Sequence, residues 1–116
     1  QSLRSLSKHI ELSEKDIQAQ GQEAKDGFLV IKGSQARMKE TSSIHKYISD
    51  IRQRLLSRQV LKKEHDVLLF TQDYRFKSPS IAASVLVGGT ANGRITWKDR
   101  NNKTLEDIQK ERVDKG

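Results

Sequence analysis

With 116 residues, the chain has the length of one domain, and its 34% hydrophobic and 32% charged residues predict one modest core rather than a disordered chain. The absence of Cys excludes disulfides, thiolate metal sites and cysteine nucleophiles, and it fits a cytoplasmic protein. No window approaches the roughly 18 apolar residues of a membrane-spanning helix, and the first residues are not a secretory signal, so we expect no membrane partner.

The positive charge is concentrated in the middle of the chain. The formal net charge is +7, and residues 28–103 carry 15 basic and 6 acidic side chains. The flanking residues 1–27 and 104–116 each sum to −1. A compact basic domain attracts polyanions, most commonly nucleic acid. The charge therefore predicts a nucleic-acid-binding domain, and the alternative is a domain whose charge only keeps it in solution.

Three segments are expected along the chain. Residues 1–14 have only a small apolar patch at helical spacing, which predicts a linker or the tail of a preceding domain. Residues 15–112 are expected to form a single α+β binding domain, and residues 113–116 a frayed tail. Because the chain begins with Gln rather than Met, we expect it to be a piece of a longer protein.

The first predicted element is a β-hairpin. Apolar residues and Gln alternate over residues 17–22, and an apolar run follows over residues 28–31. Between them Asp26-Gly27 is typical of a tight turn that needs positive φ angles.

A helix is predicted over about residues 43–58. One apolar stripe recurs at helical spacing: Ile44, Ile48, Ile51 and Leu55. The hydroxyls of residues 41–43 are candidate N-caps. Short strands at residues 60–61 and 67–70 follow, with a charged hairpin tip at residues 62–66. A helix followed by a basic hairpin is the layout of a winged domain, although many small α+β folds share it.

The C-terminal third contains strong capping residues. Ser78 and Pro79 are expected to begin a short helix that Gly88 ends. Turns at Asn92-Gly93 and residues 100–103 are expected to flank a strand over Ile95-Thr96-Trp97. Thr104 then caps a last helix. The predicted fold is thus a small α+β domain of β-hairpins with a central helix, a Ser-Pro-capped helix and a C-terminal helix, compatible with a winged-helix-like layout.

No arrangement of residues points to catalysis. His9, His45 and His65 lie at least 20 residues apart, and no metal-binding, hydrolase or phosphate-loop motif accompanies them. We therefore expect no catalytic residues, no metal ion and no cofactor, and interpret the chain as a binding module rather than an enzyme.

Several motifs together resemble a known family. The motifs are Ser78-Pro79-Ser80-Ile81-Ala82-Ala83, Gly88, Ala91-Asn92-Gly93, Trp97-Lys98-Asp99 and Lys103-Thr104-Leu105. Over roughly residues 12–110 the chain resembles the domain of unknown function numbered 4357, a microbial module often found C-terminal to GIY-YIG nuclease domains. A related module is the restriction-enzyme adenine methylase associated domain. The resemblance implies work on DNA and a catalytic domain tethered in the parent chain. The family usually has Gly where this chain has Asn102, which tolerates the left-handed conformation.

The predicted binding surface follows from the expected strand around Trp97. In a strand, Arg94, Thr96 and Lys98 share one face, while Ile95 and Trp97 share the other, apolar face. Trp97 is expected to anchor the core. The predicted nucleic-acid-binding residues are Asn92, Arg94, Lys98, Arg100 and Lys103, with Lys62 and Lys63 as a second patch.

The sequence thus predicts a non-catalytic accessory domain that binds nucleic acid, preferably double-stranded DNA, in a larger DNA-processing or restriction–modification protein. The alternative is a protein-interaction or oligomerisation domain with no nucleic-acid role. Single-stranded RNA is disfavoured because the chain has only 6 aromatic residues. Sequence preference and oligomeric state stay open.

Overall fold

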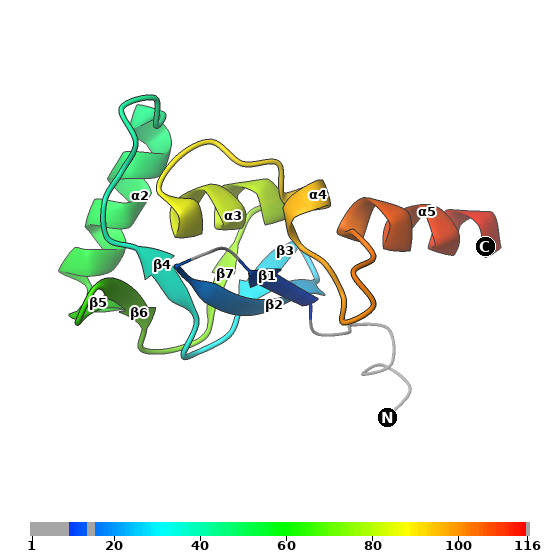
Figure 1. Cartoon of the computed structure of the whole chain (residues 1–116), viewed down its shortest axis with the longest axis horizontal. Coiled ribbons are helices and arrows are strands. Elements are labelled where there is room, and N and C mark those ends of the chain that lie inside the picture. The colour runs from blue at the N-terminus through cyan, green and yellow to red at the C-terminus, as the bar shows by residue number, and fades with distance from the viewer. Residues whose placement is uncertain (1–9, 14–15, 116) are drawn as a thin grey trace.

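A computed structural model describes residues 10–13 and 16–115, whose seven strands form two antiparallel sheets (Figure 1). The larger sheet has the order β1-β2-β3-β7, with β1 at Ile10–Ser13, β2 at Gln18–Ala24, β3 at Gly27–Val30 and β7 at Tyr74–Phe76. The smaller sheet has the order β4-β6-β5, with β4 at Gln35–Arg37, β5 at Leu61–Glu64 and β6 at Val67–Phe70. The helices are α2 at Lys46–Ser57, α3 at Pro79–Val87, α4 at Gly93–Thr96 and α5 at Leu105–Lys115. This confirms the predicted α+β class.

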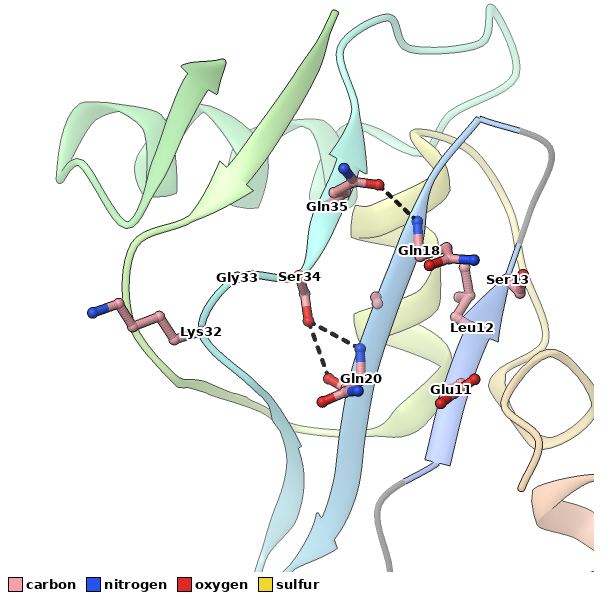
Figure 2. Close-up of a pocket in the computed structure, with 10 residues that line it drawn as sticks. Glu11, Leu12, Ser13, Gln18, Gln20, Lys32, Gly33, Ser34 and Gln35 are labelled. Atoms are coloured by element: carbon pink, nitrogen blue, oxygen red, sulfur yellow. Dashed lines mark hydrogen bonds between the residues drawn. The ribbon is translucent and has the colours of Figure 1, made fainter. Parts of the chain in front are cut away.

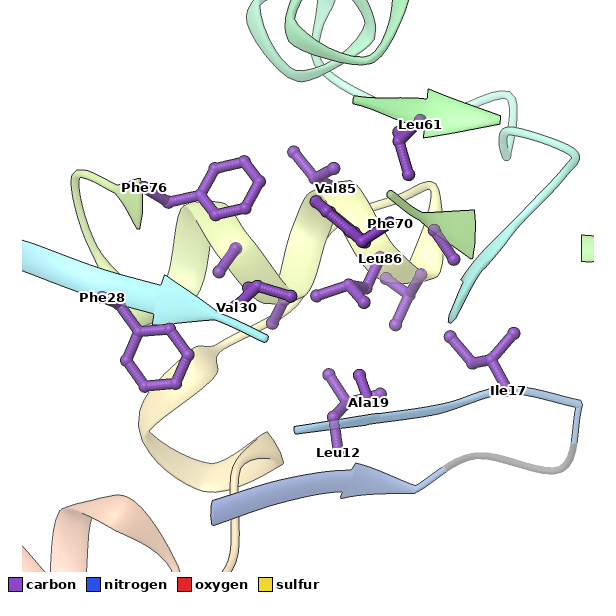
Figure 3. Packing of buried hydrophobic residues seen from close by; sticks show 14 of the residues in the cluster. Leu12, Ile17, Ala19, Phe28, Val30, Leu61, Phe70, Phe76, Val85 and Leu86 are labelled. Atoms are coloured by element: carbon purple, nitrogen blue, oxygen red, sulfur yellow. The ribbon is translucent and has the colours of Figure 1, made fainter. Parts of the chain in front are cut away.

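Helix α3 is the centre of the core. Its residues 82–87 are all buried, because the helix packs against α2, α4 and strands of both sheets. Figure 3 shows Val85 and Leu86 of α3 surrounded by side chains from several strands. Ala82 and Ala83 are fully buried, so their small size lets α3 approach its neighbours closely, as the sequence predicted.

Trp97 is the largest fully buried side chain, which confirms its predicted role as a core anchor. Its ring lies against Phe28, with the ring centroids 4.7 Å apart. The indole Nε1 donates a hydrogen bond of 3.1 Å to the Pro79 carbonyl, so the polar atom of the ring also has a partner. Trp97 thereby connects the first residue of α3 to the larger sheet.

The hairpin of β2 and β3 is confirmed, with Ala24 opposite Gly27. The role expected for Gly27 was partly wrong. Asp26 takes the positive φ of 64°, whereas Gly27 is not among the residues with positive φ. A Cβ at Gly27 would collide with the Phe76 carbonyl of β7, so glycine is needed there for the close approach of two strands.

Helix α2 begins later than predicted. It starts at Lys46, and its N-cap His45 makes no side-chain capping bond, so the predicted capping by Thr41–Ser43 was wrong. The backbone N–H of Thr41 instead donates to the Gly88 carbonyl, which ties this loop to the end of α3. The predicted stripe is confirmed for Ile48, Ile51 and Leu55, which are buried in α2, whereas Ile44 lies before the helix and is partly buried.

The hairpin after α2 is present in the predicted order but with a different boundary. Lys62 and Lys63 lie within β5 rather than at the hairpin tip. The turn consists of His65 and Asp66, and His65 takes a positive φ of 56°. Pairing of β6 with β4 extends the hairpin into the three-stranded sheet.

The predicted caps of α3 are confirmed. The Ser78 hydroxyl accepts a hydrogen bond from the Ile81 N–H, and Pro79 occupies the first turn. Gly88 ends the helix in the left-handed conformation with φ 71°. Asn102 also takes a positive φ, of 66°, as its turn requires.

Both ends of the described chain differ from the sequence-based boundaries. Residues 10–13, expected in a linker, form β1, and their side chains Ile10 and Leu12 are buried in the core. The alternating burial of β1 shows why: two apolar residues suffice when the strand pairs with β2. Residues 1–9 lie outside the described residues. At the other end, α5 extends to Lys115, three residues beyond Arg112.

Candidate nucleic-acid interface

The segment after Asn92 is a helical turn, not the predicted strand. The Asn92 side chain accepts a hydrogen bond of 3.0 Å from the Arg94 N–H and so caps α4. A Cβ at Gly93 would overlap the backbone of Pro79, which explains why glycine follows Asn92. The pair Asn92-Gly93 therefore begins a helix packed on α3, and the prediction of a tight turn followed by a strand was wrong.

The predicted basic face changes with this correction. In the helical turn Ile95 is 49% exposed, whereas Trp97 is fully buried, so the two do not share an apolar face. Arg94 is exposed, and its Nε donates a hydrogen bond of 3.0 Å to Gln109 of α5. The Asn92 amide oxygen is occupied by its capping bond.

The next predicted residues lie in the loop that follows α4. The backbone of Lys98 pairs with Glu11 of β1 and with Thr104, and the residue is half-buried. Asp99 organises the turn by accepting hydrogen bonds from the Asn101 and Lys103 N–H groups. Arg100 is exposed at the turn itself.

Lys103 already has a counter-ion. Its Nζ lies 2.5 Å from the Glu111 carboxylate of α5. This contact raises the pKa of Lys103 above its usual value, and the charges of Asp99 and Asp107 act in the same direction. The predicted first patch is thus interleaved with acidic side chains. Glu111 lies within α5, and the sequence alone did not show that its side chain lies beside Lys103.

The second predicted patch gains two arginines from the structure. Lys62 and Lys63 are exposed on β5, the outer strand of the smaller sheet. Arg54 and Arg58, at the end of α2, are exposed next to this strand. In Figure 1 the end of α2 and β5 lie at the left, whereas the loop after α4 lies at the right. The structure therefore does not bring the two predicted patches together.

Arg52 of α2 is buried, with 1% exposure. Its guanidinium donates to the carbonyls of Arg37, Met38 and Val85 and to the Glu40 carboxylate. Burial lowers its pKa, and the charge of Glu40 opposes that shift. Arg52 is therefore a structural residue that joins α2 to α3.

Sequence analysis did not find a polar hollow of about 360 Å³ beside β1 and β2 (Figure 2). Its wall includes the Ser34 hydroxyl, which donates to the Gln20 carbonyl and accepts from the Gln20 N–H. The Gln18 N–H likewise donates to the Gln35 side chain. β3 ends at Val30, which pairs with Gly21, so residues 18–20 at the start of β2 have no paired residue in β3. The side chains of Ser34 and Gln35 bind the backbone there in place of a neighbouring strand. The hollow is thus explained by the place where the two sheets separate.

Two further observations concern metals and membranes. Across residues 10–13 and 16–115, no three His, Asp or Glu side chains lie close enough together to hold a metal ion. None of the helices in this part of the chain has the length and apolarity needed to cross a bilayer.

The family model for a domain of unknown function, DUF4357, matches residues 10–109. The chain belongs to this family. The match begins at the first residue of β1 and ends within α5, so it covers both sheets and the loop after α4. This confirms the family resemblance drawn from the sequence motifs. Searches of curated proteins and of solved structures found no significant match to the chain.

Proposed function

We propose that this domain binds double-stranded DNA through its phosphates and acts as a non-catalytic accessory module of a larger DNA-processing protein. The main support is positive charge without counter-charge. Of the 15 cations in residues 28–103, four form ion pairs within the described residues: Arg37, Lys46, Arg52 and Lys103. The remaining cations of this segment have no carboxylate partner among the described residues, so their charge is not neutralised by an ion pair and can attract a polyanion.

The family resemblance supports the wider context of this proposal. The resemblance implies that modules of this kind accompany nuclease or restriction–modification proteins. We therefore propose a cytoplasmic parent protein in which a tethered catalytic domain acts on the DNA that this module holds.

Duplex binding at two salt concentrations tests the proposal. A fluorescently labelled duplex of about 20 base pairs would be titrated with the protein and followed by anisotropy. If three to five phosphates are neutralised, log K falls with log salt at a slope of about −3 to −4.5. The affinity then drops roughly 60- to 500-fold between about 50 and 200 mM salt. No binding, or an affinity that salt leaves unchanged, would refute phosphate-directed DNA binding.

The second candidate is a protein-interaction or oligomerisation domain. The observation that favours it is an apolar hollow of about 420 Å³ between α2 and α3, lined in part by Tyr47, Ile48 and Ile81. Tyr47 is 52% exposed at this hollow, so its aromatic side chain is accessible to a protein partner. This candidate requires a mass that rises with concentration in sedimentation experiments and no salt-sensitive DNA binding.

A further inference from the structure

We propose that the phosphate-binding surface of this domain lies where the end of α2 meets β5, and that duplex DNA runs along the free edge of β5. The inference rests on the proposed DNA-binding function and adds the location and orientation of the ligand. The surface, here called the α2–β5 surface, consists of four cations: Arg54, Arg58, Lys62 and Lys63.

The backbone holds these four residues close together. The Arg58 N–H donates to the Arg54 carbonyl, so the two arginines stand one helical turn apart on the same side of α2. Only Gln59 and Val60 separate Arg58 from the start of β5, and Gln59 takes a positive φ of 62° that turns the chain into the strand. Helix α2 also packs against β5.

All four side chains are exposed and none has a carboxylate partner among the described residues. Lys62 and Lys63 alternate to opposite faces of β5. Both are exposed, and β5 is an edge strand of its sheet. A phosphate backbone that passes along the edge of β5 can be reached by both long side chains, whereas one that lies on either face can be reached by only one.

The tip of the hairpin limits this surface. Glu64 ends β5 and Asp66 lies in the turn, and both are exposed. Two carboxylates at the tip repel phosphates, so insertion of the tip into a DNA groove is disfavoured. The footprint therefore ends at Lys63, and the base of the hairpin, not its tip, contacts the duplex.

The surface first expected from the sequence is electrostatically weaker. Lys103 is paired with Glu111, and Asp99 and Asp107 add negative charge around it. The side chain of Arg94 is hydrogen-bonded to Gln109. A polyanion would have to compete with these contacts, whereas no carboxylate of the described residues pairs with the α2–β5 surface.

A structural role for the same cations makes a different prediction. Lysines on an edge strand prevent pairing with other sheets, and arginines at a helix C-terminus offset the helix dipole. Those roles would make the α2–β5 variants aggregate or unfold, but they would not change the salt dependence of DNA binding.

Charge-matched double variants test the location by the anisotropy titration described above. The variants Arg54→Gln/Arg58→Gln and Lys62→Gln/Lys63→Gln each remove two charges from the proposed surface. The control Lys98→Gln/Arg100→Gln removes the same charge from the other end of the molecule. We expect each surface variant to reduce the salt slope by about 1.8, which corresponds to two phosphate contacts. The control is expected to keep the wild-type slope.

The tip provides an independent test in the opposite direction. Glu64→Gln/Asp66→Asn removes the proposed repulsion, and we expect this variant to bind the duplex more tightly than the wild type. An unchanged or weaker affinity would contradict the edge-on arrangement. Circular dichroism melting of each variant, together with amide-shift mapping on the unmodified protein, keeps the test valid if a variant unfolds.

The outcomes separate the two proposals. If the wild type binds DNA with a steep salt slope and the control lowers that slope as much as the surface variants do, the location is wrong and the function stands. Amide shifts centred on residues 94–103 rather than 54–63 would lead to the same conclusion. If the wild type does not bind the duplex, the proposed function itself fails.

Discussion

Replacement of Arg52 is the sharpest test of how this fold is held together. The variant Arg52→Met keeps an apolar side chain of similar length in α2 but removes every donor. The guanidinium makes four hydrogen bonds in the wild type, three of them to the carbonyls of Val85, Arg37 and Met38. These carbonyls would lose their charged donor in a part of the protein where water has little access.

The expected loss of stability is about 3 kcal/mol. Removing one partner of a buried ion pair costs about 3–5 kcal/mol, because the other partner stays buried without a counter-charge. The lower end applies here, since the Glu40 side chain remains 26% exposed and can be hydrated when Arg52 is lost. The change Glu40→Gln keeps an oxygen for the Ser49 hydroxyl but leaves the buried Arg52 without a counter-charge, so it is also expected to cost about 3 kcal/mol or more.

Urea unfolding followed by circular dichroism measures both variants. With a slope of about 1–3 kcal/mol per molar urea, a loss of 3 kcal/mol lowers the midpoint by about 1–3 M. Arg54→Met on the exposed side of α2 is the matched control and is expected to stay within about 0.5 kcal/mol of the wild type. If Arg52→Met is also within that range, the buried network does not stabilise the fold and the reasoning is refuted. The double variant with Glu40→Gln then measures how strongly the two charges are coupled.

Three further predictions concern single sites. Gly93→Ala places a Cβ into the backbone of α3 and is expected to lower the free energy of unfolding by at least about 2 kcal/mol. Gly33→Ala meets open space, and only its positive φ opposes the change, so the expected loss is about 1 kcal/mol. Equal losses of the two variants in urea unfolding would contradict this. Trp97 is expected to emit at short wavelength and to resist acrylamide quenching until the protein unfolds, because it is fully buried; strong quenching of the native protein would disprove that burial. The hydrogen bond from Arg37 holds the pKa of Asp16 below its usual value. This ion pair therefore stabilises the fold above about pH 3.9, and its contribution is lost as the pH falls through the lowered pKa of Asp16. Asp16→Asn is expected to make acid unfolding less steep below that pH, and an identical acid profile for variant and wild type would refute the assignment.

Local sequence signals determined the elements whose cause is local. The Ser78 cap, the Gly88 terminator and the hairpin of β2 and β3 depend on residues within a few positions of one another, and the structure confirms all three. The apolar stripe of α2 is similarly local, and its Ile48 and Ile51 are buried as expected. The excess positive charge of residues 28–103 is also a property of the sequence alone, and it carries the proposed function.

Only the tertiary structure decided the features that depend on distant partners. β1 is a strand because β2 and Lys98 pair with it, although its four residues give almost no signal alone. Residues 93–96 are helical because Gly93 must fit against the start of α3, whereas the alternation Ile95-Thr96-Trp97 favours a strand.

In the candidate site, too, some features follow from the sequence and others depend on tertiary contacts. The sequence located the cations but not the acids that neutralise some of them, since Glu111 lies beside Lys103 only once α5 has formed. It also did not show that Arg52 is buried, because that burial depends on the packing of α2 on α3. Charge is therefore specified by composition, but whether a charge is free to bind a ligand depends on which side chains the fold brings beside it.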